Sequence, residues 1–133
     1  MAFFHDEHGN PLPKGTAIEF PSYYHHEAII DFDCYGQQVL LEKSKRMGKP
    51  TITDPATYLN IKAQVSRRPA TVAHAFQITT RARAEIAAGK PWTIWDNCQD
   101  FVSRAYEGKS GSKGRNFVTG AAAVLGLAAI LAG

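Results

Sequence analysis

Cysteine is scarce in this chain of 133 residues, which carries only Cys34 and Cys98. Two cysteines make no disulfide framework, and no signal peptide precedes the first residues, so we expect a reducing, cytoplasmic setting. His5 and His8 lie in a leader without cysteines, and no cluster has the spacing of metal ligands. We therefore expect no metal and no other cofactor.

Charge of one sign is also sparse, because 15 Lys and Arg against 12 Asp and Glu leave a formal net charge of +3. The basic residues are scattered and are not interleaved with stacking aromatics, which argues against nucleic acid as a ligand. Hydrophobic residues make up 44% and charged residues 20% of the chain. This composition is typical of one small globular domain with a modest core.

Residue periodicity predicts an α+β fold. Alternation indicates strands near residues 16–20, 27–32 and 37–43, and apolar spacing indicates a helix over residues 72–88. The remaining segments are less regular: residues 43–50 are turn-like, 55–63 form a short helix or strand, and 66–69 form a loop. Cys34 is expected in the turn of a hairpin.

A second helix is predicted to begin at Cys98. Asn97 is a good N-cap, Asp100 three residues later completes a capping box, and Gly108 ends the helix. Cys98 then meets the positive end of the helix dipole, which favours a thiolate and hence a nucleophile. The alternative is a small buried hydrophobic residue.

A candidate base for this thiol lies upstream, in the strand predicted within residues 22–31. Alternation places His26 on the apolar face and Glu27 and Asp31 on the polar face. Imidazole can take a thiol proton near neutral pH and return it to a leaving group. The alternative is a core histidine whose hydrogen bonds are all satisfied.

Residues 24–30 resemble the histidine box, and residues 97–102 the cysteine box, of the lecithin:retinol acyltransferase-like family. Residues 13–20 are similar to that family's opening strand, and residues 81–92 to the helix and turn before its cysteine box. The resemblance implies a circularly permuted papain-like fold of the NlpC type, with a small antiparallel sheet packed on helices and a C-terminal hydrophobic helix. It also implies phospholipase A and acyltransferase chemistry.

The chain departs from the family pattern on the strand after the histidine box. Acyltransferases of the family usually carry a second histidine there, which orients the first, and residues 37–42 contain none. If the two strands form a hairpin, Glu42 lies opposite the start of the first strand and can accept the imidazole N–H. Gln38 is the second choice. The alternative for Glu42 is an exposed charge at a strand end.

Together with the resemblance, these residues suggest a reaction. His26 deprotonates Cys98, the thiolate attacks a glycerolipid ester, and the acyl thioester passes to water or an amine. The N–H groups at the helix start, supported by Asn97 and Tyr24, stabilise the oxyanion. Two tryptophans between the predicted helices either floor an acyl-binding cleft or pack in the core.

The end of the chain predicts a membrane anchor. Residues 117–133 carry no charge, and as a helix they would span ~26 Å of a hydrocarbon core of ~30 Å. We thus divide the chain into a catalytic domain (1–108), a basic flexible linker (109–116) and a hydrophobic tail (117–133), with the domain on the cytoplasmic side. The alternative is a tail packed on protein or on a second tail through its small residues.

Two other functions stay open at this point. The same fold and Cys-His pair support amidase or peptidase action on peptidoglycan peptides. A non-enzymatic interaction factor that retains both boxes is the other.

Overall fold

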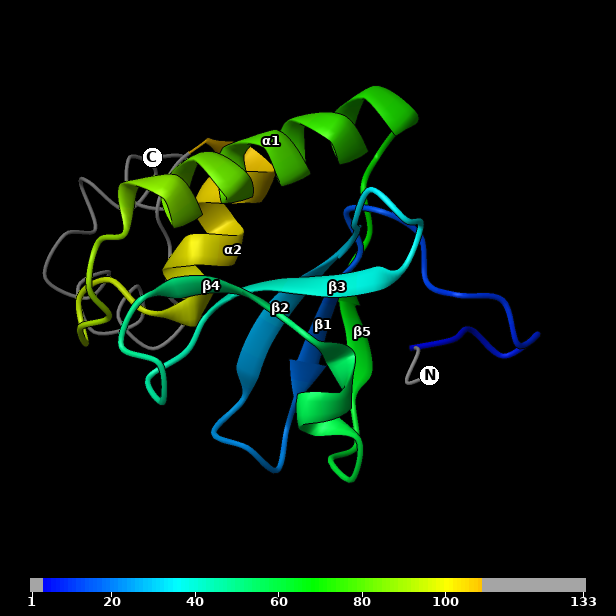
Figure 1. Ribbon diagram of the computed structural model, residues 1–133, viewed down its shortest axis with the longest axis horizontal. Helices are drawn as coiled ribbons and strands as arrows, with labels where there is room; N and C mark the ends of the chain where they lie inside the picture. The colour runs from blue at the N-terminus through cyan, green and yellow to red at the C-terminus, as the bar shows by residue number, and fades with distance from the viewer. Residues whose placement is uncertain (1–3, 109–133) are drawn as a thin grey trace, which may run out of the picture.

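The computed structural model describes residues 4–108, which form an α+β domain with one antiparallel sheet and two α-helices (Figure 1). The sheet has five strands in the order β4-β3-β2-β1-β5. In chain order the elements are β1 (Ala17–Phe20), β2 (His26–Phe32), β3 (Gln38–Lys43), β4 (Pro50–Thr53), the 3₁₀ helix η1 (Pro55–Tyr58), β5 (Gln64–Arg67), α1 (Val72–Ala88) and α2 (Cys98–Glu107).

The proposed linker and tail, residues 109–133, lie outside the described part of the chain. Between residues 4 and 108, neither helix has the length and apolar character needed to cross a bilayer.

The predicted hairpin of β2 and β3 forms, with Ala28 opposite Glu42 and Phe32 opposite Gln38. Its turn is stabilised by the Asp33 carboxylate, which accepts hydrogen bonds from the backbone N–H groups of residues 35 and 37. Cys34 is exposed in this turn, as predicted.

Both faces of the central strands β2 and β3 are buried. Ile29 and Leu41 pack against Phe101 of α2, and α1 and α2 lie together on this face (Figure 1). Ile30 and Leu40 point the other way, toward a second cluster that contains Leu12 from the N-terminal segment and Tyr58 from η1. The sheet is therefore the middle layer of the domain.

The prediction of a polar face on β2 is wrong, because the helices cover it. Glu27 and Asp31 are both buried, and Asp31 Oδ2 lies 2.8 Å from Arg83 Nε of α1 while Oδ1 lies 2.7 Å from Lys14 Nζ. Burial by itself raises the pKa of Asp31, but the hydrogen bonds from Lys14 and Arg83 outweigh it and lower the pKa. This carboxylate thus joins the sheet to α1.

Two further expectations need correction. The chain before His26 is a turn and not a strand, since Tyr24 and His25 adopt positive φ angles of 57° and 54°. Ser66 and Arg67, expected in a loop, belong to β5, which pairs with β1 at the edge of the sheet. The turn matters for the site because it sets where His26 enters the sheet.

The hydroxyl group of Tyr106 fastens the end of α2 to the sheet. It accepts a hydrogen bond of 3.1 Å from the Ala17 backbone N–H, lies 3.1 Å from the Arg67 carbonyl oxygen, and also bonds the Gly15 carbonyl. Burial raises the pKa of Tyr106 to about 12, so the phenol stays protonated at neutral pH.

Replacing Tyr106 with phenylalanine tests this connection. The buried Ala17 N–H then loses its acceptor, and we expect the free energy of unfolding to fall by about 1–3 kcal/mol. Urea denaturation measures it, with Tyr35→Phe in the exposed hairpin turn as control. Equal stability of the two variants would contradict the role of the hydroxyl.

Candidate active site

The first turn of α2 presents Cys98. The Asn97 side chain accepts hydrogen bonds of 3.0 and 3.2 Å from the backbone N–H groups of Gln99 and Asp100, and Asp100 accepts one of 3.0 Å from the Asn97 N–H. The predicted capping box is therefore present, and α2 ends at a left-handed Gly108 as expected. Cys98 is the first helical residue and is partly exposed.

His26 joins Cys98 to Glu42. The imidazole, only 5% exposed, places Nε2 2.6 Å from Oε1 of the fully buried Glu42. Cys98 lines the same cavity as this ring and raises its pKa. Because Nε2 is engaged by Glu42, Nδ1 is the nitrogen left for the thiol. The structure thus brings together the three residues that the sequence singled out. The reading of Glu42 as an exposed strand-end charge is wrong.

Charge interactions favour the protonated form of His26. Burial lowers the pKa of His26, but the interactions of the ring with Cys98 and Glu42 outweigh burial and raise the pKa to about 9. Burial by itself raises the pKa of Glu42. Hydrogen bonds, including those from His26 and Tyr58, outweigh burial and lower the pKa below its usual value. At neutral pH, Glu42 is a carboxylate that holds an imidazolium.

Aromatic side chains enclose His26 and Glu42. The Phe20 ring stacks on His26 with centroids 6.0 Å apart and planes 13° apart, and the Tyr23 ring meets His26 edge-on. Tyr58 donates a hydrogen bond of 2.5 Å to the same Glu42 oxygen that contacts His26. The imidazole is therefore fixed in orientation by packing as well as by hydrogen bonds.

Tyr58 is the residue of this site that sequence reasoning missed. The pair Asp54-Pro55 signals a helix start, because Asp54 caps η1 and Pro55 opens it. No local pattern indicates that the last residue of that helix reaches Glu42.

A cavity of about 330 Å³ opens onto the site. Its lining residues are Tyr23, Tyr24, His26, Lys45, Arg46, Trp92 and Cys98. Trp92 is partly buried there, whereas Trp95 is 66% exposed, so the interpretation of both tryptophans as core residues is wrong. Tyr24 is 91% exposed and lies at the mouth of the cavity.

Gln38, the second choice for orienting His26, is engaged elsewhere. Its side-chain amide bonds the backbone of Phe4, with distances of 2.6 Å to the N–H and 3.1 Å to the carbonyl oxygen. Gln38 pairs with Phe32, at the opposite end of β2 from His26. It therefore cannot contact the imidazole.

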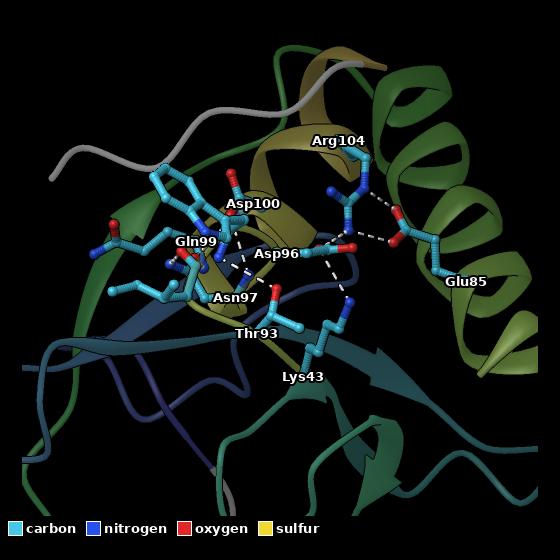
Figure 2. Close-up of polar contacts among 10 residues, drawn as sticks. Lys43, Glu85, Thr93, Asp96, Asn97, Gln99, Asp100 and Arg104 are labelled. Atoms are coloured by element: carbon cyan, nitrogen blue, oxygen red, sulfur yellow. Dashed lines mark hydrogen bonds and ion pairs between the residues drawn. The ribbon is translucent and has the colours of Figure 1, made fainter. Parts of the chain in front are cut away.

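A chain of ion pairs holds the segment before Cys98 in place (Figure 2). The buried Lys43 ammonium lies 3.0 Å from Asp96 Oδ1, as an ion pair without hydrogen-bond geometry. Arg104 of α2 contacts the same Asp96 oxygen at 2.6 Å and Glu85 of α1 at 2.7 Å. Figure 2 shows Asp96 between the two cations. Side chains of β3, α1 and α2 therefore all hold the chain segment that leads to Cys98.

Among residues 4–108, no group of three His, Cys, Asp or Glu side chains could hold a metal ion. Comparison of the chain with protein-family models, with curated proteins and with solved structures finds no match. The site is therefore interpreted from its geometry and chemistry.

Unequal effects are expected when the two ends of the Lys43–Asp96 pair are changed. Asp96→Asn leaves the Lys43 ammonium buried without a counter-charge, and we expect a loss of about 2–3 kcal/mol in the free energy of unfolding. Lys43→Met removes the buried charge itself and should cost less than about 1 kcal/mol. Urea unfolding compares both with Lys62→Met at an exposed site. Equal losses of stability in Asp96→Asn and Lys43→Met would contradict the role of Asp96 as the counter-charge of Lys43.

The titration of His26 tests its interaction with Cys98. In Cys98→Ala the interaction that offsets burial is lost, so the protonated ring is less favoured and the pKa of His26 should fall below about 9. NMR of the ring protons across pH measures the pKa. Cys34→Ala is the control and should leave it unchanged. An unchanged value in Cys98→Ala would show that the two side chains do not interact.

Proposed function

We propose that this protein is a thiol acyltransferase or phospholipase that cleaves acyl esters of glycerolipids through an acyl thioester on Cys98. The observation that carries the proposal is the position of His26, which shares the wall of a cavity with Cys98 and is hydrogen-bonded to the buried Glu42. A nucleophile, a base and a group that orients the base are the requirements of covalent acyl transfer.

In the first half of the reaction, the proton of Cys98 resides on His26. The thiolate attacks the ester carbonyl carbon, and the carbonyl electrons move onto oxygen. When this intermediate collapses, the carbon–oxygen bond breaks and the leaving alkoxide takes the proton from His26. The products are an alcohol and an acyl thioester on Cys98, while Glu42 keeps the ring in place and stabilises its charge.

In the second half, His26 takes a proton from water or an amine as that acceptor attacks the thioester. Collapse expels the Cys98 thiolate and returns the site to its starting state. The N–H groups of Gln99 and Asp100 bind the Asn97 cap. We therefore assign the oxyanion to the Cys98 N–H, with Asn97 holding the turn and Tyr24 at the mouth.

The order of the site along the chain supports a circularly permuted papain-like domain. His26 lies on a strand that precedes the helix of Cys98, which is the order implied by the resemblance to the lecithin:retinol acyltransferase-like family. Glu42 takes the place of the second histidine of that family. Carboxylates and imidazoles are both able to accept the N–H of a catalytic histidine.

Aromatic walls favour an acyl ester as the substrate. Tyr23, Tyr24 and Trp92 line the cavity with Cys98, and apolar lining with a few polar groups is typical of sites for small, largely apolar ligands. As part of the same proposal, residues 117–133 anchor the cytoplasmic domain to a bilayer, where acyl chains are concentrated.

Intact mass spectrometry after incubation with phospholipid tests the mechanism. We expect an acyl adduct on the wild-type protein and on Cys34→Ala, and none on Cys98→Ala. His26→Gln should slow adduct formation about 10²- to 10⁴-fold because the general base is lost. Glu42→Gln should slow it about tenfold or more, since the ring loses its anionic partner.

Substrate arms separate this proposal from its rivals. Release of peptidoglycan fragments without acylation by phospholipid would favour amidase action on the same thiol. An equal adduct on wild type and Cys98→Ala would reject Cys98 as the nucleophile. No turnover of either substrate class would favour a non-enzymatic interaction factor.

A further inference from the structure

Two cations lie at the tip of the turn between β3 and β4. The turn is closed by a hydrogen bond of 2.9 Å from the Gly48 N–H to the Ser44 carbonyl and by one of 3.1 Å from the Met47 N–H to the Ser44 hydroxyl. Gly48 has a φ of 73°, which glycine adopts without strain. Lys45 and Arg46 are exposed on this turn, and both line the cavity that contains Cys98.

The segment before α2 lies against this turn. The Trp92 N–H donates a hydrogen bond of 2.7 Å to the Gly48 carbonyl, and the Lys45 ammonium lies 5.5 Å from the centroid of the Trp92 ring. Tyr58, which bonds Glu42, raises the pKa of Arg46 and so favours its charged form. Both cations are therefore held at the cavity wall by neighbours of the reactive pair.

No acidic side chain in the described part of the chain lines this cavity. Glu42 lies fully buried behind His26 and Tyr58, and Asp96 is occupied by Lys43 and Arg104. Neither Lys45 nor Arg46 forms an ion pair with a residue between positions 4 and 108. The approach to Cys98 thus carries positive charge, and a cleft lined by one sign of charge concentrates ligands of the other.

We propose that Lys45 and Arg46 form an anion subsite that selects acyl donors whose headgroup carries a net negative charge close to the ester, hence anionic over zwitterionic or uncharged glycerolipids. The proposal rests on the function proposed above and adds the charge of its substrate. A guanidinium and an ammonium are the side-chain groups that bind phosphate oxygens, and a phospholipid carries its phosphate within a few bonds of each ester.

The charge of the subsite is measurable without turnover, by alkylating Cys98 with iodoacetate and with its uncharged analogue iodoacetamide. We expect the ratio of the two rate constants to be about fivefold higher at Cys98 than at the exposed Cys34 of the same molecule. Lys45→Glu should lower the ratio at Cys98 about five- to tenfold, and Lys45→Arg should retain it. Lys62→Glu is the matched control on the surface, outside the cavity, and should change nothing.

The dependence of the alkylation ratio on salt tests the same subsite in the wild-type protein. Raising ionic strength from about 0.01 M to 1 M shortens the Debye length from about 30 Å to 3 Å, so the ratio at Cys98 should fall toward that at Cys34. The anion subsite is overturned if, at low salt, Cys98 and Cys34 show the same ratio of rate constants. It is also overturned if the ratio at Cys98 changes neither with salt nor in Lys45→Glu.

The substrate arm uses dihexanoyl phosphatidylglycerol and dihexanoyl phosphatidylcholine as dispersed monomers, and vesicles of the long-chain lipids. We expect kcat/KM for monomers to favour phosphatidylglycerol about tenfold, and Lys45→Glu but not Lys62→Glu to abolish the preference. A preference seen only with vesicles would overturn the subsite, because the cations would then act on the membrane surface. Loss of all turnover with a retained alkylation ratio would reject the proposed enzyme and leave the anion subsite supported.

Discussion

The register of the β2–β3 hairpin is the constraint on which the candidate site depends. Because Ala28 pairs with Glu42, the carboxylate lies on the same face of the sheet as His26, two residues before Ala28. A slip of one residue would turn Glu42 to the other face and bring Lys43 toward the imidazole. The buried Glu42–His26 hydrogen bond would then be replaced by repulsion between two cations.

The end of β3 serves both halves of the reactive pair. Glu42 holds the base on one face, and its neighbour Lys43 holds Asp96, two residues before Cys98, on the other. Successive side chains of a strand point in opposite directions, so one short segment holds both the base and the loop that leads to the nucleophile. After Lys43 the chain enters the turn that carries Lys45 and Arg46, both of which line the cavity. The end of β3 thus connects the geometry of the reactive pair to the charge of the cavity.

Local patterns predicted most of the secondary structure and failed where distant contacts decide. The predicted capping box of Asn97 and Asp100 and the predicted ends of α1 and α2 are confirmed. These features depend on residues that are neighbours in the sequence. β5 was missed because it forms by pairing with the edge of β1, and its residues show only partial burial. The polar face assigned to β2 was wrong since alternation separates two faces but does not say what covers each.

The sequence by itself determined the identities of Cys98 and His26 as a candidate pair, the cap that presents the thiol, and the arithmetic that places Glu42 opposite the start of β2. These depend on short-range geometry, which a period of 2 or 3.6 residues encodes. Tertiary structure alone decided that Tyr58 shares Glu42, that Gln38 is bound to Phe4, and that Lys45 and Arg46 line the cavity. Those contacts join segments distant in the chain, and packing, not periodicity, selects which of them meet.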